Sequence, residues 1–354
     1  MTRFLSNIHA AIQPYTPGEQ PQGRTFVKLN TNENPYPPSP AVIAAISAAE
    51  AGRLNLYPDP ECSALNQAIA LTHGVDAIQV MTGNGSDEIL AFAYMAYCMG
   101  KRAVFPDITY GFYPVYARLF GVEYREIPLK ADFTIDPADY DQAGGTIFIA
   151  NPNAPTGIAL TREQIARIAR ENRNDLVVVD EAYVDFGGES ALDLIGELDN
   201  ILVVRTFSKS RSLAGLRVGY AISTPEIIAE LNAMKFSFNP YNVDRLAMLA
   251  GAAAVLDREY FENRVQSIVK TREEFSRKLK EQGYEVLPSC ANFVFARHPR
   301  LGGQALYQGL KENGVLVRWF DQERIRDYLR ITIGTPEQMA EYEKAASAVE
   351  RAKE

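Results

Sequence analysis

The stretch VVRTFSKSRSLAGLRVGYA, from Val203 to Ala221, joins two apolar segments through a polar loop. Its first residues continue an apolar run that begins at Ile201, which predicts a buried strand. Lys209 follows this strand between two serines, and Arg217 comes eight residues later. Because lysine is seldom buried, a lysine directly after an apolar strand requires a chemical reason.

Apolar runs of the same kind recur at 79–81, 102–105, 146–150, 176–179, 201–205 and 218–222 of the 354 residues. Continuous apolar strands that alternate with helical patterns predict an α/β fold with a mostly parallel sheet covered on both faces. Beyond about residue 239, charged amphipathic stretches precede short strands at 292–296, 314–319 and 328–333. We therefore predict a large domain (41–240), a small α+β domain (241–354) and an N-terminal segment (1–40) packed with the small domain.

Two sequence pairs predict where helices begin. Ser39-Pro40 and Asp59-Pro60 each place a capping residue before a proline, which suits the first position of a helix. Gly74 then suits the end of the second of these helices.

The bulk composition excludes several classes of protein. A formal net charge of −8 argues against a general nucleic-acid or anionic-membrane binder. The longest apolar stretch, 89–99, is too short to span a bilayer, the start of the chain lacks the apolar core of a signal peptide, and the three scattered cysteines suit the cytoplasm. The three histidines lie far apart, so we expect neither a metal site nor a histidine-based triad.

Two segments place polar side chains where strands end. MTGNGSDEIL leads from a strand through a glycine turn into a helix, and the free N–H groups at Gly85, Ser86 and Asp87 form either a phosphate cradle or an ordinary helix cap. LVVVDEAYVDF places Asp180 after four apolar residues and Tyr183 three positions later. A buried carboxylate needs a partner, so Asp180 is a cap, half of a structural ion pair, or the partner of a protonated ring nitrogen.

Lys209 completes this set. It is either a solvated surface lysine or an amine whose pKa is lowered by burial and by the nearby Arg217. Such an amine is a nucleophile whose natural partner is an aldehyde. A further strand runs into the rigid turn NPNAPTG, where a side chain is well placed to touch a ligand. A phosphate cradle, a carboxylate for a pyridinium nitrogen and a lysine for an aldehyde together predict a pyridoxal phosphate site.

These motifs resemble those of the fold-type I pyridoxal phosphate-dependent transferases: Asp180 with Tyr183, the NPNAPTG turn, and SK followed by GLRVG. Within that superfamily the chain resembles the histidinol-phosphate aminotransferase family, through KLNTNENPYPPS, LYPDP, GNGSDE, TYGFY and YLRITIGTPEQ, which lie in family order from about residue 29 to residue 338. The resemblance implies a mostly parallel mixed sheet between helices, a smaller α+β domain, pyridoxal 5'-phosphate as cofactor and a homodimer.

The resemblance also implies roles for individual residues. Lys209 would bind the cofactor aldehyde and shuttle a proton, Asp180 would pair with the ring nitrogen, and Tyr183 would approach the phenolic oxygen of the ring. The other implied cofactor contacts are Gly85, Ser86, Asp87, Tyr110, Asn151, Asn153, Ser208 and Arg217, with Tyr57 reaching across the homodimer. The implied substrate contacts are Tyr15, Asn32, Arg318 and Arg330.

One position departs from the family pattern. The family has an asparagine before Pro-Thr-Gly that donates to the phenolic oxygen of the cofactor, and this chain has Ala154. We expect Asn151, Asn153 or Tyr183 to take over that role.

The expected reaction is transamination between histidinol phosphate and 2-oxoglutarate in histidine biosynthesis. Because guanidinium groups bind phosphates and carboxylates equally well, two other enzymes stay open as alternatives. One is an aromatic or broad-specificity aminotransferase, with Tyr15, Tyr110, Tyr113 and Trp319 around the substrate, and the other resembles threonine-phosphate decarboxylase. A non-catalytic cofactor-binding domain of a transcription regulator is a further alternative, which requires an attached DNA-binding domain.

Overall fold

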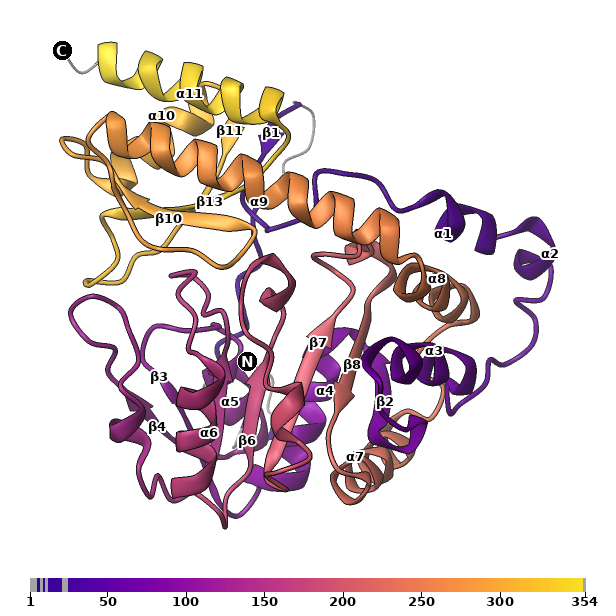
Figure 1. The fold of residues 1–354 in the computed structure, drawn as a ribbon. Helices are drawn as coiled ribbons and strands as arrows, with labels where there is room; N and C mark the ends of the chain where they lie inside the picture. Colours follow the sequence, from indigo (N-terminus) through magenta and orange to yellow (C-terminus); the bar gives the residue numbers. More distant parts are fainter. Residues whose placement is uncertain (1–4, 7–8, 10–11, 21–24, 353–354) are drawn as a thin grey trace.

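The computed structural model describes residues 5–6, 9, 12–20 and 25–352. Its large domain contains a seven-stranded sheet with helices on both faces (Figure 1). In spatial order the strands are β2 (Val80–Asn84), β8 (Val218–Ile222), β7 (Ile201–Thr206), β6 (Val177–Asp180), β5 (Thr146–Ala150), β3 (Arg102–Pro106) and β4 (Glu123–Ile127). Strand β8 runs antiparallel to β2 and β7, and the other neighbouring pairs are parallel. The predicted α/β class with a mostly parallel mixed sheet is confirmed.

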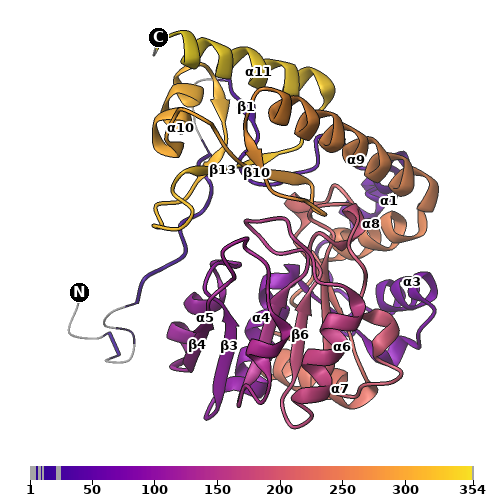
Figure 2. The same cartoon turned by 60° about the vertical axis from the view of Figure 1, so that its left-hand side comes forward.

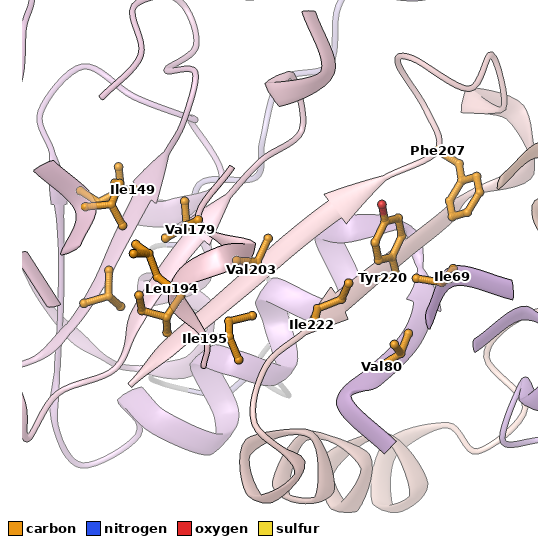
Figure 3. Close-up of a cluster of buried hydrophobic side chains, with 14 of the residues drawn as sticks. Ile69, Val80, Ile149, Val179, Leu194, Ile195, Val203, Phe207, Tyr220 and Ile222 are labelled. Carbon is orange, nitrogen blue, oxygen red and sulfur yellow. The ribbon is translucent and has the colours of Figure 1, made fainter. Parts of the chain in front are cut away.

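The two faces of this sheet bury alternate side chains of each strand. Val179 and Val203 join the apolar cluster under helices α3, α6 and α8, and Figure 3 shows them beside Ile222 of the next strand. Val178 and Val204 lie in the opposite cluster, under α4, α5 and α7. Both faces are therefore apolar, which is why these strands read as continuous apolar runs.

The helices α1 to α11 span Pro40–Ala45, Ala48–Ala51, Ser63–His73, Gly85–Ala93, Tyr113–Phe120, Arg162–Glu171, Pro225–Phe238, Arg245–Leu256, Arg258–Glu281, Gly303–Glu312 and Pro336–Arg351.

The small domain combines two short sheets with α9, α10 and α11 (Figures 1 and 2). Its antiparallel sheet has the order β12 (Arg318–Trp319), β13 (Tyr328–Thr332), β10 (Phe293–Arg297) and β9 (Glu285–Val286). The second sheet pairs β1 (Val27–Lys28) with β11 (Val315–Leu316) in parallel, so the chain ahead of the large domain adds a strand to the small one. The predicted strand 314–319 divides between these two sheets.

The helix starts agree with the capping pairs at one position and differ at the other. Helix α1 begins at Pro40, as predicted, and the Ser39 hydroxyl accepts a hydrogen bond from the N–H of Val42. The prediction of a helix start at Pro60 is wrong, because α3 begins at Ser63. The Asp59 carboxylate accepts from the N–H of Ser63 at 2.8 Å across a turn in which Cys62 has φ +54°.

The division into domains stays a proposal. Part of the predicted N-terminal segment (1–4, 7–8, 10–11 and 21–24) lies outside the described residues. Helix α8 contributes Ala247 and Ala250 to the large-domain cluster and packs against α1 and α3. We therefore propose that the large domain extends through α8, beyond the predicted boundary at residue 240.

Candidate active site

The polar residues singled out above gather where the strands of the large sheet end. Asp180 ends β6, Lys209 follows β7, and Ser86 follows β2, which points the same way as β7. Arg217 directly precedes β8, and because this strand runs in the opposite direction, its start lies at the same edge. Parallel strands thus bring together residues that are far apart in the sequence.

Two adjoining cavities open at this edge. The first, which we call the Asp180 cavity, is lined by Ser86, Asp87, Asp180, Ser208 and Arg217 and has a volume of about 260 Å³. The second, the Arg330 cavity, is lined by Tyr15, Asn30, Asn32, Arg318 and Arg330 and has a volume of about 350 Å³. Both are also lined by the same five residues, which are Thr31, Tyr110, Ala154, Tyr183 and Lys209. Lys209 therefore stands at the junction of the two.

Lys209 is half-buried at this junction, and its amine has little solvation. Its Nζ donates a hydrogen bond to the carbonyl oxygen of Thr31 at 3.2 Å, and Asn34 holds the Lys209 carbonyl oxygen through its Nδ2 at 3.0 Å. Burial first, and then the positive charge of Arg330, lower the pKa of Lys209 to about 8. The amine therefore loses its proton readily near neutral pH, as a nucleophile or a proton carrier requires.

Asp180 is buried with two hydrogen-bond donors. The Tyr113 hydroxyl donates to Oδ2 at 3.2 Å, and the N–H of Ala182 donates to Oδ1 at 3.2 Å. Burial raises the pKa of Asp180 to about 7. Within the described ranges no salt bridge to a lysine or arginine offsets this effect. A carboxylate in this position fits a cation that enters with a ligand, such as a protonated ring nitrogen.

The start of α4 and Arg217 form the other end of the Asp180 cavity. Gly85 has φ +76°, and a Cβ there would approach Arg217 Nη2 to 2.7 Å, so only glycine allows this guanidinium to lie against the helix start. Arg217 donates to the Ser208 hydroxyl at 3.4 Å and to the Asp87 carboxylate at 3.0 Å. A helix N-terminus, a hydroxyl and a guanidinium fit a phosphate dianion.

Two tyrosines separate the cavities. The Tyr183 hydroxyl accepts a hydrogen bond from Asn32 Nδ2 at 2.9 Å, which leaves its own proton free to be donated elsewhere. The Tyr110 hydroxyl donates to Asp87 at 2.7 Å. These bonds hold both phenols at the junction beside Lys209, whose Nζ lies 5.9 Å from the centre of the Tyr183 ring.

The asparagines of the NPNAPTG turn line neither cavity. Asn151 exchanges two hydrogen bonds with the backbone of Leu160, at 2.7 and 3.1 Å. Asn153 donates to the carbonyl oxygen of Ile108 and accepts from the Thr109 hydroxyl. Their placement does not support the expected contacts with the cofactor, because both amides are occupied by these hydrogen bonds. Within the turn, Ala154 lines both cavities and Pro155 lines the Arg330 cavity.

The segments that carry Asp180 and Lys209 are joined by a buried ion-pair network. Glu181 pairs with Arg205 at 2.8 Å, and Arg205 lies 3.5 Å from Asp185. Asp185 in turn accepts a hydrogen bond from the Ser210 hydroxyl at 2.5 Å. The residue after Asp180 is thereby linked to the residue after Lys209, which fixes the spacing of the two reactive groups.

Two arginines dominate the Arg330 cavity. The Arg330 guanidinium lies 5.4 Å from the ring centre of Phe293 and 5.6 Å from that of Phe320, and burial lowers its pKa. Its Nη2 donates to Asn30, whereas its buried Nε has no acceptor in the part of the chain that the structure describes. Arg318 donates to the carbonyl oxygens of two residues of the N-terminal segment, Thr16 and Pro17, at 3.1 and 3.2 Å. The cavity thus offers two cations to an anionic substrate.

The remaining two predicted residues, Tyr15 and Tyr57, differ in their surroundings. Tyr15 stacks on Phe112 with ring centres 4.3 Å apart and lines the Arg330 cavity, as a substrate contact would. Tyr57 is 79% exposed, stacks on Tyr241 and lines neither cavity of its own chain.

Sequence reasoning missed two residues of the site. The sequence suggests Tyr113 only as a substrate contact of an aromatic aminotransferase. In the structure Tyr113 is fully buried and binds Asp180. Thr31 acts through its carbonyl oxygen, a group that every residue carries, so its side chain gives no signal. The only sequence clue to Tyr113 is its place three residues after Tyr110 in the TYGFY motif.

The residues present fit pyridoxal phosphate. Its ring nitrogen, phosphate and aldehyde require an anion, an anion cradle and an amine, and the Asp180 cavity provides Asp180, the α4 start with Ser208 and Arg217, and Lys209.

Comparisons with known proteins agree with this chemistry. The family model "Aminotransferase class I and II" matches residues 24–346. The chain is 54% identical to histidinol-phosphate aminotransferase 1 of Bradyrhizobium diazoefficiens, over 96% of this chain and 97% of that protein. It is 51% identical to histidinol-phosphate aminotransferase 2 of Dechloromonas aromatica, over 95% of this chain and 96% of that protein.

Solved structures share the fold. The histidinol-phosphate aminotransferase of Sinorhizobium meliloti, determined with pyridoxal 5'-phosphate, superposes with a TM-score of 0.89 at 23% identity and covers 100% of this chain and 99% of its own. At that identity the likeness shows the fold alone, whereas the family model and the relatives above half identity show kinship. The chain therefore belongs to the class I and II aminotransferases and, within them, to the histidinol-phosphate aminotransferase family.

Proposed function

We propose that this protein uses pyridoxal 5'-phosphate to transfer the amino group of histidinol phosphate to 2-oxoglutarate, a step of histidine biosynthesis. The observation that carries the proposal is that the Asp180 cavity, which fits the cofactor, meets the Arg330 cavity, which fits an anionic substrate, at Lys209. The full-length relatives at about half identity support the same reaction.

In this proposal the residues of the Asp180 cavity hold the cofactor. Bound pyridoxal phosphate supplies an aldehyde carbon that accepts an amine and a ring that withdraws electrons from it. The N–H groups at Ser86 with the Ser208 hydroxyl and Arg217 bind the phosphate, and Asp180 accepts the hydrogen bond of the protonated ring nitrogen. Tyr183 would donate its hydroxyl proton to the phenolic oxygen, because its own oxygen already accepts a hydrogen bond from Asn32. This arrangement gives Tyr183 the role expected of the missing asparagine at 154.

Lys209 moves the proton. Its Nζ, with a pKa lowered to about 8, is neutral often enough near neutral pH to remove the proton from the carbon that bears the donor amino group. The Thr31 carbonyl oxygen accepts a hydrogen bond from the same amine, and so keeps it at the junction of the cavities.

Arg318 and Arg330 bind the anionic end of each substrate. The two substrates take turns, so one pair of guanidinium groups serves the phosphate of histidinol phosphate and a carboxylate of 2-oxoglutarate. The Arg330 cavity offers fewer aromatic contacts to an aromatic donor than expected. Tyr113 is fully buried, and Trp319 stacks on Tyr307 instead of lining the cavity.

The proposal includes a cytoplasmic homodimer. Tyr57 is available to a second copy of the chain, because its ring is exposed and faces neither cavity of its own subunit. The cysteines Cys62, Cys98 and Cys290 are free, which suits a reducing compartment. Among the helices of the described residues, none combines the length and the apolar character that crossing a bilayer demands.

A donor panel tests the substrate. Holoenzyme is supplied with 2-oxoglutarate and, in turn, histidinol phosphate, phenylalanine, tyrosine or aspartate, and glutamate formation is measured. We expect the highest kcat/KM with histidinol phosphate. An aromatic amino acid as the best donor would refute the proposed substrate and leave the cofactor site intact, whereas carbon dioxide release from threonine phosphate would identify a decarboxylase.

A further inference from the structure

Tyr113 begins α5 directly beside the Asp180 cavity, and nothing in the reaction outlined above uses it. We propose that Tyr113 is a positioning residue for this reaction: its hydroxyl orients the Asp180 carboxylate and favours its charged form, so that Asp180 can bind the protonated ring nitrogen of the cofactor. The inference rests on the proposed function, because it concerns the same cofactor.

The two carboxylate oxygens have separate donors. Tyr113 donates to Oδ2 and the N–H of Ala182 donates to Oδ1, each at 3.2 Å. The plane of the carboxylate is thereby fixed from both sides, and its remaining lone pairs are left for the cavity that Asp180 lines. A free carboxylate on a rotating side chain would lack this orientation.

The Tyr113 ring is held so that its hydroxyl cannot turn away. Its ring centre lies 5.5 Å from that of Phe148, and 5.7 Å from those of Phe105 and Tyr110. The side chain is completely buried. Dense packing of this kind restricts the ring to one rotamer, so the direction of the hydroxyl is set by the core.

The hydroxyl acts as a donor at every working pH. Burial, and then the charge of Asp180, raise the pKa of Tyr113 well above its usual value, so the phenol keeps its proton. The negative charges of Asp87 and Glu181 act on Asp180 in the opposite direction and favour its neutral form. Lys209 and Arg217 line the same cavity, but neither forms a salt bridge with Asp180 in the part of the chain described. Tyr113 therefore contributes a hydrogen bond that stabilises the charged form of Asp180.

This role predicts a pH-dependent defect in Tyr113→Phe. With the cofactor bound, Asp180 is charged at all pH values of interest, whereas without it the carboxyl is protonated below about pH 7. Loss of the donor at low pH therefore weakens the bound state, in which the acceptor is charged, more than the free state, in which it is neutral. At high pH the acceptor is charged in both states, and the loss weakens them alike. We expect the dissociation constant to rise about tenfold at pH 6 and to match wild type at pH 9, since hydrogen bonds to charged groups are the strong ones.

The experiment uses cofactor-stripped full-length protein and 4'-deoxypyridoxine 5'-phosphate, which lacks the aldehyde and so leaves Lys209 out of the measurement. Binding is followed by quenching of protein fluorescence at pH 6, 7, 8 and 9. The matched control is Tyr94→Phe, which removes an equally buried hydroxyl that donates to the Tyr113 carbonyl oxygen at 3.0 Å and does not touch Asp180. Its affinity ratio to wild type should not vary with pH.

A second comparison separates positioning from loosened packing. In an Asp180→Asn background the carboxylate is gone, so the additional change Tyr113→Phe should alter affinity by the same factor at every pH. A Tyr113→Phe defect of constant size from pH 6 to pH 9, or no defect at all, would refute the inference while leaving the proposed function in place. If wild-type protein itself fails to bind the probe, the cofactor site is wrong and the inference falls with it.

Discussion

Replacing Asp180 by asparagine should make the cofactor-free protein more stable at alkaline pH, although it removes the residue that we propose to bind the cofactor nitrogen. Burial raises the pKa of Asp180 from 3.8 to about 7, so the folded protein holds this proton more tightly than the unfolded chain does. The free energy of unfolding therefore falls as the pH rises from about 4 to about 7, and changes no further above that range. Asparagine has no charge and should abolish this loss.

The size of the effect follows from the shift. About three pKa units at 1.4 kcal/mol each give a penalty of about 4 kcal/mol once the carboxylate is fully charged. Of this, about 1.7 kcal/mol is already present at pH 5, because the unfolded chain has lost its proton there and the folded protein has not. The stabilisation by Asp180→Asn should thus be larger at pH 8 than at pH 5 by about 2 to 3 kcal/mol. The side-chain oxygen of the asparagine still accepts a hydrogen bond, so a change in hydrogen bonding contributes little to the difference in stabilisation between pH 5 and pH 8.

Urea unfolding of the stripped protein at pH 5 and pH 8, at one protein concentration, measures this quantity. Asp193→Asn is the control, because it removes a carboxylate whose side chain is 66% exposed and which pairs with Arg162. An Asp180→Asn stabilisation of the same size at both pH values would show that the carboxylate is not desolvated as the structure indicates.

Three further substitutions test the other parts of the site. Lys209→Ala should abolish glutamate formation, by at least about a thousandfold, while probe binding stays within a few-fold of wild type; measurable turnover would remove Lys209 from the mechanism. Arg330→Lys should raise KM for histidinol phosphate about tenfold to a hundredfold in steady-state assays, because an ammonium group cannot bind bidentately, with Arg326→Lys as a control outside both cavities. Gly18→Ala should raise the same KM about threefold to tenfold, because its Cβ would overlap Thr31 and displace the segment that holds Arg318; an unchanged KM would contradict a role for this segment.

The strands that the sequence predicts are those buried on both faces. β6 and β7 read as apolar runs because Val178 and Val204 face one helix layer and Val179 and Val203 the other. The edge strand β4 was missed, because Glu123–Ile127 is mostly exposed and carries charged residues. Charges on this edge oppose pairing with other chains, so β4 lacks the apolar signal that reveals the central strands. The two-residue strands β1 and β9 are too short to form any pattern.

The site was predictable to the extent that it consists of charges at the ends of apolar runs. Lys209 and Asp180 are conspicuous for this reason, and the structure places them in one cavity. Tyr113 is not conspicuous, because an aromatic residue in an amphipathic helix is usually part of the core, and only the fold shows what its hydroxyl reaches. Asn151 and Asn153 illustrate the reverse case, in which polar residues at a strand end bind the backbone, of Leu160 and of Ile108 respectively, instead of a ligand.

Lys209 and Asp180 have pKa values near 8 and near 7, so at neutral pH each is close to changing its charge. Burial causes both pKa shifts, and the two groups line the same cavity. The same desolvation that lowers the stability of the empty protein therefore suits the cavity to its ligand. A bound pyridinium nitrogen would supply the missing cation to Asp180, and the neutral form of Lys209 would suit an aldehyde. It follows that substitutions at position 180 that stabilise the empty protein should weaken cofactor binding.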